Sequence, residues 1–333
     1  PHDAVMLAKY YHYEKSVAEK LALLCCSLIN TEFDVNEEIS TFEQANNIKF
    51  HPDQKNAIIN AINSGVSIIT GGPGTGKTTI VKCIITLLEA QRKRILLTAP
   101  TGRASKKLSE ATEREAKTIH RALQVDYRTK HFVFNEQNPL PYNVIIVDEV
   151  SMVDVQLMYN LLKAVARDTK LIFVGDKDQL PSVGAGNVLE DMITSEVIKV
   201  SELTQIFRQS ENSLIISNAH KINEGEMPEI DNKSQDFFFE SKTELEDIKN
   251  SIVDMVTTRI PKFNGIDSIK IQVLAPLKAG ICGIENLNRE LQAKLNPAKK
   301  FRNELIVGQT IFREGDKIMQ TANNYDIEWT RQV

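Results

Sequence analysis

The feature that most constrains this chain is a glycine-rich octapeptide between an apolar run at 66–70 and a helix-like stretch that opens with Thr79. It reads Gly71-Gly72-Pro73-Gly74-Thr75-Gly76-Lys77-Thr78. Glycines let the backbone close around an anion, and amide groups at a helix N-terminus point toward a phosphate. The pattern predicts a nucleotide-phosphate loop for ATP, with Lys77 as the positive charge and Thr78 as a ligand of Mg²⁺. An accidental glycine turn would require strand, loop and helix all to coincide.

Strand-like and helix-like segments alternate around this loop. Apolar runs at 66–69, 95–98, 144–147 and 171–174 predict strands, and helices are expected to begin at residues 77, 103 and 155. Continuous apolar strands separated by helices are typical of a parallel sheet that is covered on both faces. The predicted fold class is therefore α/β, of the P-loop NTPase type.

The flanking regions are less regular. Residues 1–45 are expected to be a helical lead-in from a missing domain, with helical periodicity over 4–29. Short alternations on either side of a polar loop at 124–142 fit either a small inserted hairpin or a solvated connector. Beyond residue 208 a second α/β portion is expected. Its expected strands are 237–240, 269–275 and 317–321, and its expected helices are 243–258 and 284–294.

Composition sets the outer limits. A length of 333 residues suggests two domains. The net charge of −4 gives no global basicity, so a nucleic-acid groove would have to be a local patch. We expect a cytoplasmic protein without a membrane partner, because no signal peptide or bilayer-length apolar stretch is present and the four cysteines lack metal-site spacing. The first residue is Pro1, not methionine, and the chain ends just after a strand-like segment, which suggests a fragment.

An acidic pair follows the apolar run at 144–147. In a P-loop ATPase, an acidic residue at this strand end holds Mg²⁺, and a following glutamate can polarise the attacking water. Asp148 is the predicted metal carboxylate and Glu149 the predicted catalytic base. Such a pair also occurs at the start of solvated helices. The upstream phosphate loop favours the catalytic interpretation.

The next strand end reads Gly175-Asp176-Lys177-Asp178-Gln179-Leu180-Pro181. This run resembles a motif of the superfamily 1 helicases, and the resemblance implies that Gln179 couples the γ-phosphate to bound single-stranded nucleic acid. Gln54 is positioned like the family's adenine-reading glutamine, whose amide can both donate to and accept from the base. Arg208, in the run 203–209, resembles the family's arginine finger, although an ordinary surface ion pair is the alternative.

Two further runs resemble the strand-contacting motifs of that family. They are 98–104, after the second predicted strand, and 118–121. By resemblance their backbone amides, hydroxyls and cations meet phosphates, whereas His120 alone could equally be a structural histidine. The implied nucleic-acid contacts are Pro100, Thr101, Arg103, His120 and Arg121.

The amino-acid sequences of two runs, 148–154 and 184–189, are most similar to those of RecD-like helicases. The runs at 273–280, 286–288 and 315–320 also resemble that family. The resemblance covers about 50–326. It implies a first RecA-like domain at 46–207, whose 124–142 insert can act as a duplex-splitting pin, and a partial second RecA-like domain at 208–333. It also implies 5′ to 3′ movement on single-stranded DNA, action at single/double-strand junctions in repair or recombination, and, in part of the family, association with nuclease subunits.

The chain departs from the family in lacking two further motifs of the second core domain, a strand-gripping run and a second arginine finger. Loss of such an arginine can lower hydrolysis roughly a thousandfold, so we expect weak turnover. Two alternatives stay open: a translocase or remodelling ATPase that does not unwind, and a P-loop small-molecule kinase. The choice between DNA and RNA rests on the resemblance alone.

Overall fold

The computed structural model describes residues 5–26, 33–125, 131–205 and 213–319. The chain divides into two compact units, Pro1–Phe237 and Phe238–Val333. The domain boundary expected at residue 208 falls within 206–212, outside the described residues. Each unit is considered by itself below.

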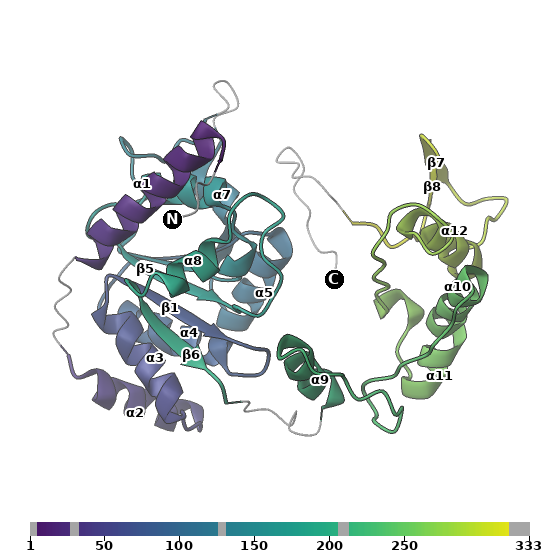
Figure 1. Ribbon diagram of the computed structural model, residues 1–333, viewed down its shortest axis with the longest axis horizontal. Helices are drawn as coiled ribbons and strands as arrows, with labels where there is room; N and C mark the ends of the chain where they lie inside the picture. Colours follow the sequence, from purple (N-terminus) through teal and green to yellow (C-terminus); the bar gives the residue numbers. More distant parts are fainter. Residues whose placement is uncertain (1–4, 27–32, 126–130, 206–212, 320–333) are drawn as a thin grey trace. The chain divides into compact units, whose positions relative to one another are not determined.

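The first unit contains the parallel sheet and most of the helices (Figure 1). Its strands are β1 (Val66–Gly71), β2 (Ile95–Ala99), β3 (Ala116–Thr118), β4 (Val144–Val147), β5 (Lys170–Gly175) and β6 (Lys199–Leu203). Its α-helices are α1 (Ala8–Cys25), α2 (Val35–Asn46), α3 (Pro52–Asn63), α4 (Lys77–Ala90), α5 (Gly102–Thr112), α6 (Ile119–Leu123), α7 (Val155–Lys163), α8 (Val188–Thr194) and α9 (Leu214–Asn223).

The strands of this sheet lie in the order β3-β2-β4-β5-β1-β6, and every neighbouring pair is parallel. The four strands predicted from apolar runs are therefore confirmed, as is the parallel sheet. The sequence prediction missed the two edge strands. β3 has only three half-buried residues, and β6 alternates buried with exposed positions, so neither presents a continuous apolar run.

Helices cover both faces of the sheet, and successive strand residues alternate between two cores. Ile68 belongs to a core shared with α1, α7 and α8, whereas Ile69 belongs to a core shared with α2, α3 and α4. Figure 1 shows these two helix layers on opposite sides of the strands. The strand period of two residues produces this division. Because the strands are parallel, their carboxyl ends all lie at one edge of the sheet.

The expected lead-in packs against the sheet domain. Val17, Leu21 and Leu24 of α1 are buried in the first core. The Tyr13 and Tyr159 rings lie 4.6 Å apart between centroids, which ties α1 to α7. α2 contributes to the other core, so the segment before residue 46 supports both faces of this unit.

The insert at 124–142 has the pairing of a hairpin in its described residues. Val125 and Phe132 form an antiparallel bridge, and the Val133 amide donates to the Gln124 carbonyl at 2.8 Å. Residues 126–130 lie outside the described part. Phe132 and Phe134 pack against the first core, so the base of this insert is fixed on the domain.

The second unit has little regular sheet in its described part. Its elements are α10 (Leu245–Asp254), a π-helical turn (Met255–Arg259), α11 (Ile260–Asn264), a 3₁₀ turn (Ser268–Lys270), α12 (Ile284–Leu295), β7 (Glu304–Val307) and β8 (Thr310–Arg313). The helix expected at 284–294 is confirmed as α12, and α10 with the π turn covers most of the helix expected at 243–258.

The strands expected in this half of the chain are wrong where the structure describes them. Residues 237–240 and 271–275 are irregular, 268–270 form a 3₁₀ turn, and 317–319 are irregular, with 320–321 outside the described residues. Isolated apolar runs do not form strands without a neighbour to accept their backbone hydrogen bonds. The pairing observed in the described residues of this unit is the antiparallel β7-β8 hairpin, which the sequence prediction missed.

Candidate nucleotide and strand-binding site

The phosphate loop joins the carboxyl end of β1 to the N-terminus of α4. β1 lies between β5 and β6, and Gly76 with φ +85° is the N-cap residue of α4. A methyl group on Gly71 would lie 2.7 Å from the Leu203 carbonyl oxygen and 3.0 Å from Thr75 Oγ1, so only glycine fits there. The unpaired amides of the first turn of α4 therefore point out of the loop toward an anion.

Lys77 lies among three carboxylates at this edge. Its ammonium group donates hydrogen bonds to the carbonyls of Gly71 and Gly72, the latter at 2.9 Å. Burial lowers the pKa of Lys77, and the negative charges of Asp176, Glu149 and Asp148 oppose that shift. Three negative charges thus face two positive charges, those of Lys77 and Lys107. The excess negative charge can be balanced by a divalent cation that binds together with a polyphosphate.

Asp148 and Glu149 follow β4 directly. The Asp148 amide donates to the Thr98 carbonyl at 2.9 Å, and the Glu149 amide donates to Asp148 Oδ1 at 3.0 Å. Burial, followed by the neighbouring charge of Glu149, raises the pKa of Asp148. Glu149 adopts a left-handed conformation with φ 52°. Such backbone costs about 1–3 kcal/mol for a non-glycine residue and is concentrated at functional sites.

The oxygen donors near the loop suit Mg²⁺ bound with a nucleotide. No group of three or more His, Cys, Asp or Glu side chains that could hold a metal occurs within the described residues. Mg²⁺ is usually held by one or two carboxylates plus substrate phosphates, without a full protein cage. The Asp148 carboxylate and the exposed Thr78 hydroxyl fit that mode.

Gln54 contacts the phosphate loop from the first turn of α3. It is 5% exposed, its Nε2 donates to the Thr75 carbonyl at 3.0 Å, and its Oε1 accepts from the His51 amide at 3.0 Å. An amide side chain offers two donor and two acceptor positions. One donor and one acceptor position therefore remain beyond these two hydrogen bonds, and the adenine-reading role of Gln54 stays a prediction.

The end of β5 carries the predicted sensor segment, the run 175–181 whose Gln179 is expected to couple the γ-phosphate to bound nucleic acid. Asp176 is buried, and its carboxylate accepts from the Asp178 amide at 3.1 Å and from Gln179 Nε2 at 3.2 Å. The Lys177 amide donates to Thr70 Oγ1 at 3.1 Å, one residue before the phosphate loop. The sensor segment therefore contacts the residue that precedes the phosphate loop, and Gln179 is exposed to solvent.

The predicted strand-contacting residues lie at the same edge, after β2 and β3. Thr101 accepts from the Ala104 amide at 3.2 Å and caps α5, and Thr118 accepts from the Arg121 amide at 3.2 Å and caps α6. Because Ala99 pairs with Thr118 across the sheet, these two helix starts are neighbours. Arg103, His120 and Arg121 are exposed, and Pro100 is half-buried. Each threonine hydroxyl still has its proton to donate to a phosphate.

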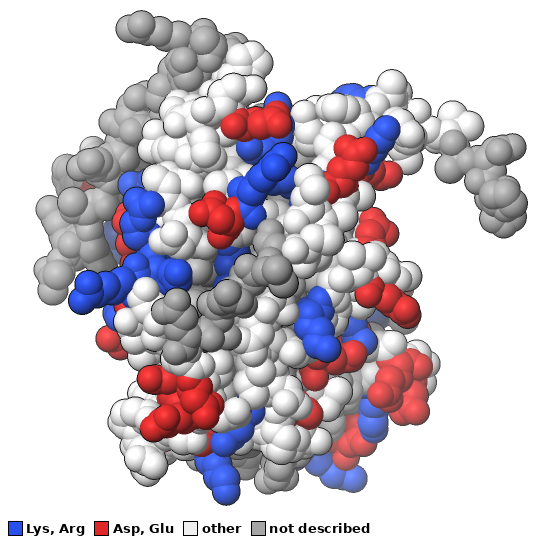
Figure 2. All heavy atoms as spheres, turned by 90° about the vertical axis from the view of Figure 1, so that its left-hand side faces the viewer, with Lys and Arg blue, Asp and Glu red and all other residues white. Residues whose placement is uncertain are grey.

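The exposed basic residues Arg103, His120 and Arg121 form a local group. Over the face in Figure 2, basic and acidic side chains are interspersed, as expected for 40 basic and 44 acidic residues. Arg208, the remaining predicted site residue, lies outside the described residues.

Two family models match the chain. Residues 54–185, which contain the loop, the acidic pair and the sensor, match an AAA domain. Residues 287–329 match the SH3 domain of ATP-dependent RecD-like DNA helicases. The second match lies within 208–333, the range expected for the partial second RecA-like domain.

Curated relatives agree with these matches. An ATP-dependent RecD2 DNA helicase of Deinococcus radiodurans is 37% identical over 261 residues, which are 78% of this chain and 34% of that protein. The RecBCD enzyme subunit RecD of Buchnera aphidicola subsp. Schizaphis graminum is 28% identical over 97% of this chain and 64% of its own length. The chain is a homologue of the RecD-like helicases. It spans about a third of the first relative and less than two thirds of the second.

A solved Pif1 helicase from Candida albicans is also similar, with 24% identity over 66% of this chain and 56% of that chain, at a TM-score of 0.44. None of the helices in the described part of the chain has the length and apolar character that a membrane crossing needs.

Two contacts of this RecD-like site were not foreseen from the sequence. Lys107, on α5, is close enough to Asp148 and Lys77 for its charge to lower the pKa of both. Asp154 caps α7 through the Leu157 amide at 2.7 Å and leaves no room for a side chain at Gly184. The adjacent lysines Lys106 and Lys107 were a sequence signal for the first contact. The contact of Asp154 with Gly184 joins positions thirty residues apart and has no local sequence signal.

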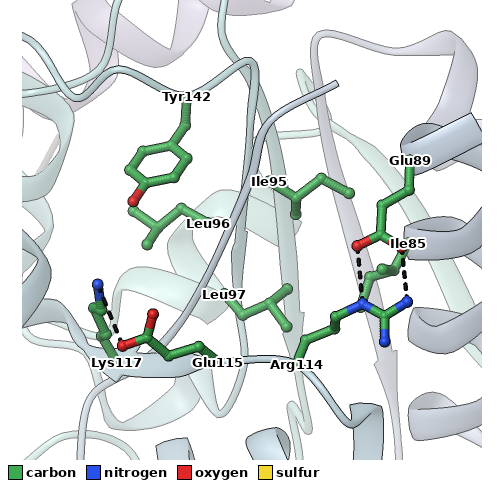
Figure 3. Close-up of a pocket in the computed structure, with 9 residues that line it drawn as sticks. All are labelled: Ile85, Glu89, Ile95, Leu96, Leu97, Arg114, Glu115, Lys117 and Tyr142. Carbon is green, nitrogen blue, oxygen red and sulfur yellow. Dashed lines mark hydrogen bonds and ion pairs between the residues drawn. The ribbon is translucent and has the colours of Figure 1, made fainter. Parts of the chain in front are cut away.

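A separate hollow of about 250 Å³ lies beside β2 and β3 (Figure 3). Its floor is apolar, from Ile95 and its neighbours, and its charged groups are paired. Arg114 donates two hydrogen bonds of 2.9 Å to Glu89, and Lys117 lies 3.4 Å from Glu115. Since both cations already have acidic partners, the hollow offers little to a phosphate, and we assign it no role.

Proposed function

We propose that this chain is the ATP-binding core of a DNA helicase that translocates 5′ to 3′ on single-stranded DNA, with a role in repair or recombination. The observation that carries the proposal is one sheet edge with two adjoining parts. Lys77 lies there among Asp148, Glu149 and Asp176, and the exposed cations beyond β2 and β3 lie on neighbouring helix starts. A small-molecule kinase would have no use for the second part.

In this proposal the loop amides and Lys77 hold the phosphates of ATP. Mg²⁺, when bound, neutralises phosphate charge and is held by Thr78 and Asp148. Glu149 orients the attacking water, Gln179 contacts the γ-phosphate, and Arg208 acts as an arginine finger. Pro73, Gly74 and Thr79 complete the loop and the helix start around the phosphates. Cycles of nucleotide binding would then shift the grip on the strand.

The DNA contacts are proposed to be chiefly to phosphate and sugar, through Thr101, Arg103, His120 and Arg121. Such contacts give little sequence preference and strong salt dependence. Single/double-strand junctions are the proposed natural substrate. Association with nuclease subunits is a proposal supported by the relatives that are named subunits of the RecBCD enzyme.

A translocase without unwinding is the second candidate. Phe132 and Phe134 pack against the core, so the described base of the insert is held on the domain. A strand-displacement assay on forked DNA distinguishes the two, because only a helicase releases the second strand.

The test of the main proposal compares the chain with Lys77→Ala. We expect Mg²⁺-dependent ATP binding, ATP-analogue-dependent binding of single-stranded DNA, and weak DNA-stimulated turnover, all lost or strongly reduced in the variant. Nucleotide binding without any oligonucleotide binding would reject the motor and favour a metabolic P-loop enzyme. Unwinding from a 3′ tail and not from a 5′ tail would reject the direction.

A further inference from the structure

The helix α9 brings a histidine to the phosphate loop. A methyl group built on Gly72 would lie 3.7 Å from His220 Cε1 and 3.9 Å from His220 Nε2. The edge of the imidazole ring therefore faces the loop backbone at its second residue. Figure 1 shows α9 as a short helix of the first unit.

His220 Nε2 is buried and has no hydrogen-bond partner among the described residues. A polar atom shielded from water without a partner costs free energy, and the cost is removed when a ligand supplies the missing partner. In the neutral imidazole, Nε2 can carry the proton and donate it. A phosphate oxygen is the acceptor that a phosphate loop brings to this position.

The phosphate concerned can be assigned from Lys77. The lysine of such a loop reaches the β- and γ-phosphates, and here its ammonium lies 2.9 Å from the carbonyl oxygen of Gly72. His220 approaches the same residue. The ring is therefore beside the terminal-phosphate end of the loop, on the side of Gly72 and away from the helix start at Gly76.

The helix that carries His220 is fixed by its own surroundings. Asn218 is buried, donates to the Glu229 carbonyl at 2.8 Å and accepts from the Glu229 amide at 2.7 Å. At the other end of α9 the Asp236 carboxylate accepts from the Leu214 amide at 3.2 Å. These contacts hold the helix in a defined rotation, with His220 toward the loop and Lys221 paired with Glu229 at 2.6 Å.

We propose that His220 is a specificity-determining residue of the nucleotide site, which donates a hydrogen bond from Nε2 to the terminal phosphate of a bound nucleoside triphosphate. The inference rests on the proposed function as an ATP site. It adds a group from α9 that distinguishes triphosphate from diphosphate, since a diphosphate leaves Nε2 without its partner. The contact that α9 makes with the nucleotide therefore differs between the triphosphate and the diphosphate.

The test is equilibrium binding of fluorescent ATP and ADP analogues with Mg²⁺ to the whole chain. We expect His220→Ala to weaken ATP binding about tenfold, the scale of one hydrogen bond to a charged group, with ADP binding changed less than twofold. His220→Gln, whose amide nitrogen can occupy the place of Nε2, is expected to restore much of the preference for ATP. Lys221→Ala, on the same helix but paired with Glu229, is the matched control and should leave both affinities unchanged.

Equal losses for ATP and ADP in His220→Ala would mean that the ring only supports the loop, and no loss for either would mean that it has no role. Both results overturn the inference. Lys77→Ala separates this failure from that of the proposed function: if the unaltered chain and Lys77→Ala both bind no nucleotide, the ATP site itself is rejected. Should His220→Ala fold poorly, the imidazole ¹⁵N resonances of the unaltered chain decide, because His220 Nε2 should shift with a non-hydrolysable ATP analogue and not with ADP.

Discussion

Gln54 Nε2 donates a hydrogen bond to the carbonyl oxygen of Thr75 at 3.0 Å and thereby joins α3 to the phosphate loop. The same side chain accepts from the His51 amide at the start of α3. One residue thus links the loop conformation to the position where an adenine would be read. Gly76 has no room for a side chain because Gln54 occupies the space.

We expect Gln54→Ala to weaken binding of both ATP and GTP, because the loop loses a buried partner, and to weaken ATP more, because the amide also reads adenine. A loss of roughly tenfold for ATP corresponds to about one hydrogen bond. Competition titrations with the two nucleotides measure it. Equal losses for ATP and GTP would leave Gln54 with a purely structural role.

Glu149 supports a second prediction, since its left-handed backbone opposes stability while its carboxylate is the proposed catalytic base. Glu149→Gly should relieve the strain and raise the free energy of unfolding by about 1 kcal/mol. The same change should abolish ATP turnover. Glu149→Gln is the control that removes the charge and keeps the backbone cost, so it should abolish turnover without that gain. Equal stability of the two variants in urea titrations would show that the strain is not released.

Asp148 leads to a related prediction about Mg²⁺. Its raised pKa means that the ionised carboxylate is less stable in the folded chain than in the unfolded chain. At a pH above both pKa values this opposes folding, and protonation at lower pH removes the opposition. Asp148→Asn should therefore stabilise the nucleotide-free chain and make Mg²⁺ ineffective in strengthening ATP binding. Thermal unfolding and ATP titrations with and without Mg²⁺ test both parts, and unchanged Mg²⁺ dependence would contradict the metal role.

Much of the first unit could be predicted because its signals are local. Four buried strands read as apolar runs, and the phosphate loop and acidic pair are contiguous motifs. β3 and β6 escaped because edge strands bury only part of their surface. The run at 271–275 looked like a strand because its composition is apolar, but within the described residues of its unit no neighbouring strand pairs with it.

The candidate site residues could be named from the sequence, but their geometry could not be predicted from it. The positive φ of Glu149, the contact of Asp154 with Gly184, and the approach of His220 to Gly72 depend on segments distant in the sequence. A one-dimensional pattern records which chemistry is present. Distances between its parts come only from the packing of strands and helices around them.

Gly184 gives a stability prediction with a matched control. Its space is filled by the side chain of Asp154, which must remain in place to cap α7. Gly184→Ala should therefore lower the free energy of unfolding by about 1–3 kcal/mol through overpacking and loss of the cap. Gly102→Ala is the control, because nothing lies within 4 Å of a methyl group there. Equal effects of the two changes on urea unfolding would contradict the contact.

Lys170 provides a pH-dependent prediction away from the nucleotide site. Its buried ammonium donates to the carbonyls of Ala61, Ile62 and Ser64 at the end of α3. Burial, followed by the charge of Lys93, lowers the pKa of Lys170 to about 7. In the unfolded chain the value is about 10.4. Between these two values the unfolded state holds more protons, so the free energy of unfolding should rise with pH.

Lys170→Met should make that rise smaller, because it removes the buried charge whose cost is greatest near pH 7. It also removes three hydrogen bonds to the end of α3, so stability should fall most at the high-pH end of the window. Urea unfolding of the unaltered chain and the variant between pH 7 and pH 9.5 measures both effects. Lys106→Met, at an exposed position of α5, removes the same charge without burial and should leave the slope unchanged. If Lys170→Met and Lys106→Met gave parallel pH profiles, Lys170 would have to keep an ordinary pKa in the folded chain, with its three carbonyl partners offsetting the cost of burial.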